Sequence, residues 1–474
     1  MIRPPEIPAP PLPTDNEERG RVQHTRIRRQ MLDGRHKQVI EARRTEHIGR
    51  QKSYHHGPVD MSANPFRVLY RELSVLYDEP PQVHHDAEAD LAGLLGTEGS
   101  LALSGLWSTM ARFQTWVLGC REYLLRPHVS ADGDLRFRPV APDMVTATSH
   151  EDSPDQPVSV SELRLRRHPD RDEWIWTRDV LDISDPTFPI YQITDAKAEE
   201  PIDLTIAYLG EPMSGDLYPY RKADGTPVLP YVLYHAERLG DRLWDPYEGI
   251  EIVEGSLNLA SALSFWFHAL QQASWPQRYL VNCTPAGLST SASGSNEYVA
   301  DPASVLLLTA NDDGLQPVVG QWGPGANVEM LGKAIDQYAA RLAHTAGIRV
   351  GDIQRVSANA RSGYAIAMTN DGKIQAQRRF TPQFQYADQN LIGLAAIMLN
   401  RATGTTYPES GYRVAYRQAR LGGAELKQRR EHVLEMVKEG LMSRVQAYML
   451  INPGTSEAQA TAELQRIAGQ LLTF

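Results

Sequence analysis

The sequence predicts an α+β protein, because stretches with helical spacing flank a stretch with strand alternation. Residues 64–122, 248–274 and 327–346 carry apolar side chains at intervals of three and four, which is typical of helices. Residues 121–240 alternate apolar and polar side chains, which is typical of half-buried strands. Hydrophobic residues make up 42% of the 474 and charged residues 22%, close to globular averages, so we expect a large core and about three structural units.

Charge and cysteine content exclude several classes of protein. The net charge of −10 argues against a generally basic nucleic-acid clamp. The two cysteines, Cys120 and Cys283, exclude a disulfide framework and a thiolate metal cage, and they favour reduced, intracellular assembly. The start MIRPPEIPAPPLP has no apolar signal region, and the apolar stretch 257–270 is too short to cross a bilayer. We therefore expect a soluble protein with no membrane contact.

Residues 1–60 are predicted to form a flexible basic arm. They hold twelve Lys or Arg and eight Asp or Glu, and residues 1–14 contain six prolines. One interpretation of the arm is contact with an acidic partner or nucleic acid. The favoured one, for residues 16–52, is a solvated helix with ion pairs such as Glu41 with its Arg neighbours.

Residues 61–247 are predicted to combine helices with an antiparallel β layer. Asn64-Pro65 gives a helix start, and a second helix over 101–118 places Leu106, Met110, Phe113 and Val117 on one face. Asp132-Gly133 and Asp224-Gly225 are hairpin signals. The alternating pairs are Leu135/Phe137, Val158/Val160, Leu163/Leu165 and Trp174/Trp176.

Residues 248–346 are predicted to place a β excursion between two helices. The helix 248–274 is apolar on nearly every side, so we expect it to be buried on all sides, in a large domain or at an oligomer interface. Residues 277–326 form a small separate module with three short strands. The helix 327–346 then carries one apolar face, formed by Met330, Leu331, Ile335, Tyr338 and Leu342.

The remaining chain is predicted to be a polar loop followed by helices. Residues 347–362 read GIRVGDIQRVSANARS, and a long helix begins near Gly363. We expect interruptions at 370–372, Asn-Asp-Gly, and at Thr381-Pro382, before the helix resumes through Asn400. Capping boxes at Ser443 to Gln446 and Ser456 to Gln459 open two further helices.

A search for catalytic motifs is mostly negative. The chain has no Walker A P-loop, no G-x-G-x-x-G, no H-E-x-x-H and no G-x-S-x-G, so we expect neither an enzyme nor a bound cofactor. Metal binding by His55-His56 or by His84-His85-Asp86 is disfavoured, because adjacent side chains point to different faces. An acid–base role for Glu248, Glu251 and Glu254 competes with a simpler one, stabilisation of a helix N-terminus. Cys283 is expected to be a packed thiol.

Several segments, in a fixed order, carry a resemblance to a known family. They are WTRDVLDISD at 176–185, LPYVLY at 229–234 leading into EIVEGSLNL at 251–259, RSGYA at 361–365, GLMS at 440–443 and LINPG at 450–454. In their order and spacing they resemble the portal proteins of tailed bacteriophages, over most of residues 64–474. None of them is a catalytic signature, and residues 16–52 match no pattern of the family.

The resemblance implies a portal fold and a ring, usually of twelve subunits, at one capsid vertex, with double-stranded DNA passing through its centre. The β-rich wing would be residues 61–247, the two-helix stem 248–274 and 327–346, and the small α/β clip 275–326. Residues 347–423 would hold the tunnel loop, the long tunnel helix and a return to the wing, and 424–474 the helical crown. The clip would dock the terminase large subunit and later the head–tail adaptor.

The tunnel loop is where the resemblance places DNA contacts. Arg349, Arg355, Asn359 and Arg361 are the residues expected to face DNA, while pairing of the arginines with Asp352 or with neighbouring subunits is an equally weighted alternative. A net negative ring would keep friction on the sliding duplex low. The major capsid or scaffolding protein is a further expected partner. The protein would be assembled in the host cytoplasm and located at the unique vertex of the virion.

Two other functions stay open from the sequence. One is an intracellular hydrolase or nuclease that uses an unrecognised carboxylate site, with Glu248, Glu251 and Glu254 as its candidates. The other is a different virion structural protein, such as an adaptor. The β excursion between two helices, together with the large region before it, favours a portal over an adaptor.

Overall fold

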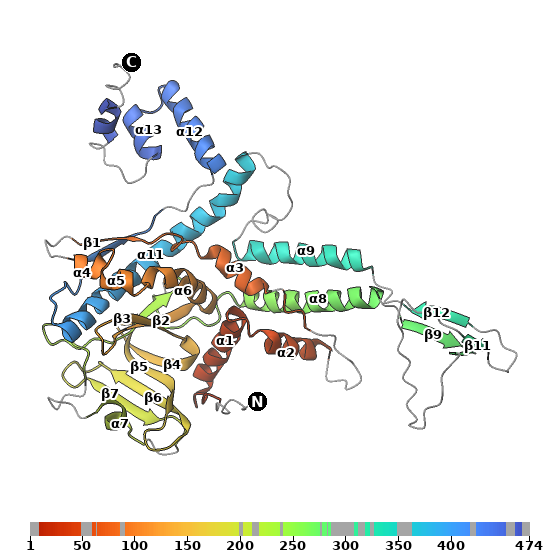
Figure 1. Ribbon diagram of the computed structural model, residues 1–474, viewed down its shortest axis with the longest axis horizontal. Helices are drawn as coiled ribbons and strands as arrows, with labels where there is room; N and C mark the ends of the chain where they lie inside the picture. Colours follow the sequence, from red (N-terminus) through yellow and green to blue (C-terminus); the bar gives the residue numbers. More distant parts are fainter. Residues whose placement is uncertain are drawn as a thin grey trace. The chain divides into compact units, whose positions relative to one another are not determined.

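The structure is a computed structural model that divides into two compact units, whose elements are labelled in Figure 1. It describes residues 9–48, 59–62, 64–85, 91–198, 202–210, 218–237, 240–274, 277–281, 283–285, 308–310, 318–322, 327–347, 363–417, 423–451 and 460–466. The first unit comprises residues 1–29, 69–248 and 347–474, and the second comprises 30–68 and 249–346. Helices and strands both build the chain, which confirms the α+β class.

Two antiparallel sheets of the first unit share one hydrophobic core. Their strand orders are β3-β2-β8 and β4-β5-β6-β7. The strands are β2 (Glu122–Val129), β3 (Leu135–Val140), β4 (Val145–His150), β5 (Ser153–Arg167), β6 (Trp174–Asp182), β7 (Ile190–Asp195) and β8 (Val232–His235). Leu124 of one sheet and Val160, Leu181 and Ile193 of the other are fully buried in this core. The predicted β layer is therefore confirmed.

The Asp-Gly turns lie where the sequence places them. Gly133, between β2 and β3, has φ of 86°, and Gly225, between the bridged residues Arg221 and Pro227, has φ of 87°. A residue with a Cβ is strained at such angles, so glycine is favoured at both turns.

Helices cover the three-stranded sheet. The helix α6 (Leu106–Cys120) packs on β2 and buries Leu106, Met110, Phe113 and Val117, which confirms the predicted apolar face. The other short elements of the first unit are β1 (Gln82–His85), α4 (Ala92–Leu95), α5 (Ser100–Leu103), α7 (Thr205–Leu209) and β13 (Tyr412–Ala415), with β1 and β13 paired antiparallel. The helix α3 (Pro65–Leu73) starts as predicted, with the Asn64 side chain accepting the Arg67 N–H at 3.1 Å.

Residues 16–48 are helical rather than an arm. They form α1 (Asn16–Leu32) and α2 (Lys37–Ile48). Arg21 and Arg28 of α1 are buried, and the Arg21 guanidinium donates to the Pro142 carbonyl at 2.9 Å and lies 4.4 Å from the Trp244 ring centre. The favoured prediction of a helix is therefore confirmed for this part. The prediction that it is flexible and solvated is wrong, because Arg21 and Arg28 are buried against partners far along the chain. Glu41 pairs with Lys37, at 3.9 Å, as an i,i+4 pair.

The helix α11 (Gly363–Thr403) is continuous and runs through the two predicted interruptions. An interior glycine costs a helix about 1 kcal/mol and an interior proline about 3 kcal/mol. Residues 391–399 of α11 are all buried, and the helix packs on β2, β8 and β13. This burial outweighs the local cost of Gly372 and Pro382, so the prediction of a broken helix is wrong.

The C-terminal part is helical where it is described. It contains α12 (Gly423–Lys438), α13 (Arg444–Ile451) and a helical segment at 460–466. The capping box that opens α13 is confirmed: the Gln446 N–H donates to Ser443 Oγ at 3.1 Å, and the Ser443 N–H donates to Gln446 Oε1 at 3.2 Å. The second predicted box, from Ser456 to Gln459, lies outside the described residues.

The second unit contains the two predicted helices with strands between them. Its elements are α2, α8 (Ile250–Ser274), β9 (Gln277–Val281), β10 (Cys283–Pro285), β11 (Leu308–Ala310), β12 (Val318–Trp322) and α9 (Val328–Thr345). The strands group with the two helices in one unit, and the division of residues 275–326 into a separate module stays a prediction. The described residues between α8 and α9 are all strand except Asn327, which caps α9. Of the helices that the structure describes, none is long and apolar enough to span a membrane.

Candidate functional site

The four predicted DNA-facing residues, Arg349, Arg355, Asn359 and Arg361, lie outside the described residues. The segment that holds them begins after α9, which ends at Thr345, and is followed by α11, which starts at Gly363. Gly347, just after α9, has φ of 78° and so adopts a conformation that favours glycine. The ends of the segment are therefore defined, and the positions of its four candidate side chains stay a prediction.

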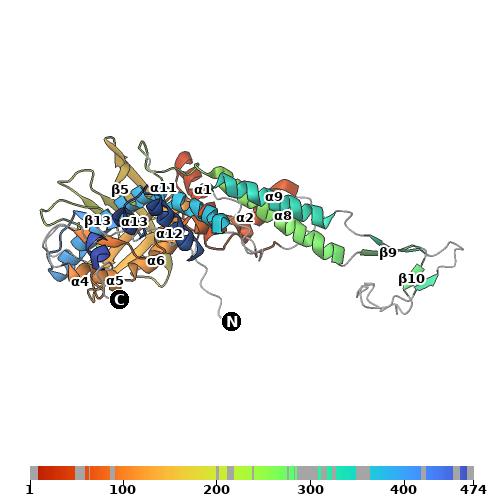
Figure 2. The same cartoon turned by 90° about the horizontal axis from the view of Figure 1, so that it is seen from above.

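Helices α8 and α9 form an antiparallel hairpin within the second unit, and Figures 1 and 2 both show them side by side. Trp266 Nε1–H of α8 donates to the Val328 carbonyl oxygen at 3.0 Å. At the other end of the hairpin, a Cβ added at Gly255 would lie 2.6 Å from Leu342 Cδ1. The first half of α8 therefore lies beside the end of α9, and the second half of α8 lies beside its start. Gly255 permits the close approach of the two helices.

The apolar residues of α9 differ in exposure along the helix. Leu342 is buried and Ile335 is half-buried, whereas Met330, Leu331 and Tyr338 are exposed to 70%, 42% and 38%. At about 3.6 residues per turn, Leu331, Ile335, Tyr338 and Leu342 share one face, as predicted, and Met330 lies to one side of it. The single chain leaves part of this face uncovered, and we call its exposed apolar residues, Met330, Leu331 and Tyr338, the outer stripe.

Helix α8 is buried on most sides only in its first half. Residues 255–257 and 259–261 are buried, but Phe267 and Leu270 in the second half are exposed by more than a third. The single chain therefore does not bury that half of α8 on all sides, and its burial at an oligomer interface stays a prediction. Both helices of the hairpin thus present large apolar side chains to solvent, which is typical of surfaces that bind another protein.

A two-stranded ribbon continues the hairpin along the chain. Strand β9 follows α8, strand β12 precedes α9, and they pair antiparallel from Gln277 opposite Trp322 to Val281 opposite Val318. Asn327 then caps α9, its side chain accepting the Met330 N–H at 3.0 Å. A second short pair, β10 with β11, places Cys283 opposite Ala310. Cys283 therefore lies in a strand, as the sequence predicts.

The three glutamates at the start of α8 have different surroundings. Glu254 forms an ion pair with Arg43 of α2, and the Arg43 Nε–H donates to Asn258 Oδ1 at 3.2 Å. Glu248 and Glu251 are exposed. The ion pair of Glu254 with Arg43 stabilises the contact between α2 and α8, which is a structural task.

The histidine candidates are only partly described. His84 and His85 lie on β1, opposite Arg413 and Tyr412 of β13, and His85 Nε2 is 2.9 Å from the Ser410 carbonyl oxygen. His55, His56 and Asp86 are outside the described ranges. Within those ranges, no group of three or more His, Cys, Asp or Glu side chains could hold a metal ion.

A buried carboxylate on α11 is surrounded by three tyrosines, and the sequence search did not find it. Asp388 is fully buried. It accepts the hydroxyl of Tyr77 at 3.0 and 2.9 Å, that of Tyr234 at 2.8 Å and that of Tyr416 at 2.6 Å. The available signal is a single aspartate next to the apolar stretch 391–399, but the tyrosines lie up to 311 residues away.

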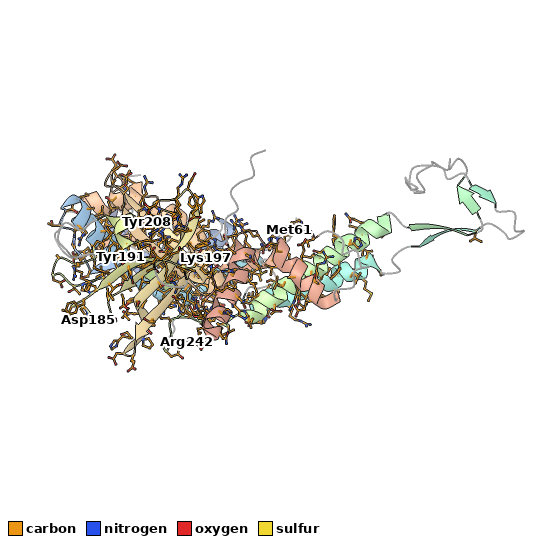
Figure 3. All side chains as sticks on the ribbon, turned by 90° about the horizontal axis from the view of Figure 1, so that it is seen from below. Met61, Asp185, Tyr191, Lys197, Tyr208 and Arg242 are labelled. Atoms are coloured by element: carbon orange, nitrogen blue, oxygen red, sulfur yellow. The ribbon has the colours of Figure 1, made fainter. Side chains whose placement is uncertain are left out.

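A second buried network joins the two sheets of the first unit. Glu162 of β5 accepts a bidentate pair from Arg138, at 2.6 and 2.7 Å, and the Tyr231 hydroxyl at 2.8 Å. On the same sheet, Arg166 pairs with Asp179, and its guanidinium lies 4.8 Å from the ring centre of Tyr208, which is labelled with Tyr191 in Figure 3. Arg138 and Arg166 thus each pair with a buried carboxylate, so we interpret the network as structural.

Comparison with known proteins adds no assignment to these sites: neither a family model nor a curated protein sequence matches the chain. The functional argument therefore depends on the arrangement of this chain's own residues.

Proposed function

We propose that this chain is a portal protein, a subunit of a ring-shaped channel at one capsid vertex through which phage DNA is packaged and ejected. The observation that carries the proposal is the α8–α9 hairpin, whose connection forms the β9–β12 ribbon and whose sides expose Phe267, Leu270 and the outer stripe of α9. Two helices that project a β segment and leave apolar sides uncovered are suited to packing side by side in a ring.

In this proposal each region has one task. The hairpin is the stem, residues 275–326 are the clip that docks the terminase large subunit and then the head–tail adaptor, and residues 61–247 are the wing. Helix α11 stands behind the tunnel loop, and residues 424–474 form the crown. The protein itself performs no catalysis, since the terminase supplies ATP hydrolysis, and the capsid or scaffolding protein surrounds the ring.

Charge supports the proposed passage of DNA. The chain carries 58 acidic against 48 basic residues. A ring of such subunits repels the duplex, whereas many phosphate contacts would hold it with several kcal/mol. Arg349, Arg355 and Arg361, with Asn359, are the few residues proposed to touch phosphates.

The assembly state is the first test of the proposal. We expect native mass measurement and particle imaging of the purified chain to show a ring with a central hole. Twelve copies of 52.9 kDa would weigh about 635 kDa. We expect the double variant Leu331→Asp/Tyr338→Asp to yield smaller species, because it places charge on the outer stripe. Leu103→Asp, at an exposed apolar residue of α5, is the matched control and should still form rings.

A wild-type chain that stays a monomer or dimer at several salt concentrations would overturn the proposal. Rings that persist in the stripe variant, with the wild-type mass, would instead show that the outer stripe is not part of the subunit contact.

The tunnel loop requires a separate test. We expect Arg355→Glu/Arg361→Glu to form rings of wild-type mass but to lower the yield of DNA-filled heads, because two proposed phosphate contacts become repulsive. The readout is nuclease-protected DNA per assembled head. Wild-type yield in this variant would show that the loop assignment is wrong.

A further inference from the structure

Asp388 joins α11 to three other segments of the first unit through one carboxylate. Tyr77 lies between α3 and β1, Tyr234 is on β8, and Tyr416 follows β13. All three hydroxyls reach the same two oxygens, and Tyr77 Oη is also 3.4 Å from Tyr416 Oη. Asp388 is thus the common acceptor that ties the long helix to the sheet and to both chain segments that flank the β1–β13 pair.

The hydrogen bonds and ion pairs of Asp388 include no cation among the described residues. Aromatic rings enclose it: Tyr77 meets Phe384 edge-on at 6.1 Å between ring centres, and Tyr234 meets Phe113 at 5.1 Å. The charged side chains on the neighbouring segments pair with one another instead, Glu79 with Arg417 at 3.0 Å and Glu237 with Arg379. A carboxylate in such a place is costly to ionise, since hydroxyls alone replace its water.

We propose that Asp388 is a proton-linked clasp, which holds α11 to its three tyrosine partners most strongly when the carboxyl group carries a proton. In the protonated form, Asp388 Oδ2–H donates to Tyr416 Oη, the shortest of the contacts. The Tyr416 hydroxyl hydrogen then turns toward Tyr77 Oη, 3.4 Å away. The proton comes from water, and no covalent bond other than O–H changes.

The electrostatics agree with this geometry. Burial raises the pKa of Asp388 to about 7, although the bonds from Tyr416, Tyr234 and Tyr77 oppose the rise. An aspartate in an unfolded chain has a pKa of about 3.9. The folded pKa is thus the higher one, so the contribution of this group to stability is complete below about pH 4 and is lost as the pH rises through about 7.

Two other buried groups make a local measurement necessary. Burial raises the pKa of Glu122 on β2 to about 7, so it acts in the same direction as Asp388. Burial lowers the pKa of His235 on β8 to about 4, so its contribution is lost in the opposite direction, as the pH falls. The pH dependence of the stability of the whole chain therefore contains contributions from several groups. The protection of α11 against hydrogen exchange is the measurement closest to Asp388.

The test uses the full chain and hydrogen exchange of the α11 peptide 384–399 at pH 6 and pH 8, corrected for intrinsic exchange rates. We expect the wild-type protection to be lower at pH 8. We expect Asp388→Asn to remove that difference and Glu122→Gln to retain it. Isotope-edited infrared spectra should show a protonated aspartate band that disappears with a midpoint near pH 7 and is absent in Asp388→Asn.

Tyr416→Phe provides a second variant that keeps the carboxyl group. Because the Tyr416 bond lowers the pKa of Asp388, its removal should shift the infrared midpoint and the loss of α11 protection to higher pH. The proposal is overturned if no protonated aspartate band persists above pH 5. It is also overturned if Asp388→Asn keeps the pH-dependent protection, or if Tyr416→Phe moves the midpoint to lower pH.

Discussion

Replacing Arg28 by alanine is expected to lower the free energy of unfolding by about 3–5 kcal/mol. Arg28 is only 1% exposed. Its guanidinium donates to the carbonyl oxygens of Gly119 at 3.1 Å, Pro246 at 3.2 Å and Glu248 at 2.6 Å. Gly119 lies in the last turn of α6, where carbonyls lack helical partners and a cation is favoured. The variant leaves three carbonyls without this donor and a cavity beside them.

The measurement is urea unfolding of the wild type and three variants. Arg19→Ala removes an exposed arginine of the same helix, which donates to the Pro13 carbonyl, and should change stability by less than about 0.5 kcal/mol. Arg28→Lys keeps the charge but not the planar fork, so we expect an intermediate loss. An Arg28→Ala loss no larger than that of Arg19→Ala would show that α1 is not anchored by this contact.

Replacing Glu162 by alanine is expected to lower the free energy of unfolding by a similar amount, about 3–5 kcal/mol. Glu162 accepts both nitrogens of Arg138, and Arg126, which is also buried, lies 3.4 Å from its Oε2. Without the carboxylate, Arg126 keeps only its bonds to the Tyr231 and Tyr220 hydroxyls, at 2.9 Å each. A buried cation without a counter-charge is the main source of the loss.

The pH dependence of Glu162 has the opposite sign to that of Asp388. Burial disfavours its charged form, but the hydrogen bond and charge of Arg138, with Arg126 and Arg164, outweigh burial and hold the pKa of Glu162 below its usual value. Its contribution is therefore present above the unfolded pKa, about 4.3, and is lost as the pH falls through the lower folded pKa.

Glu173→Ala is the matched control, since Glu173 forms an exposed ion pair with Arg171 at 3.4 Å. This variant should change the free energy of unfolding by less than about 0.5 kcal/mol. Thermal unfolding at pH 7 and pH 3 should show a large deficit of Glu162→Ala at pH 7 that narrows at pH 3. A deficit equal at both values would contradict the assigned charge state of Glu162.

Features specified by neighbouring residues could be predicted from the sequence. The cap by Asn64 and the box from Ser443 to Gln446 each join residues three apart, and both are confirmed. The helices of the α8–α9 hairpin and the antiparallel layer were likewise predicted, because hydrophobic periodicity is a local signal.

Features that depend on distant partners could not be predicted. Arg28 finds its acceptors 91, 218 and 220 residues away, and Asp388 finds Tyr77 at a separation of 311. Pro382 does disfavour a helix locally, but the burial of residues 391–399 outweighs that cost. The exposure of the outer stripe of α9 was not predicted, because spacing alone does not tell which apolar residues a single chain covers.

The pairing of Val281 with Val318 has a consequence for how such a protein can change over evolutionary time. The chain leaves the hairpin on β9 and returns on β12 at nearly the same point, so the intervening segment can lengthen, shorten or be exchanged without shifting α8 against α9. Doubling the length of a closed loop raises the entropic free energy of closing it by only about 0.6 kcal/mol. In the proposed portal, a lineage can thus acquire a new docking partner at this connection while the surfaces along the helices stay unchanged.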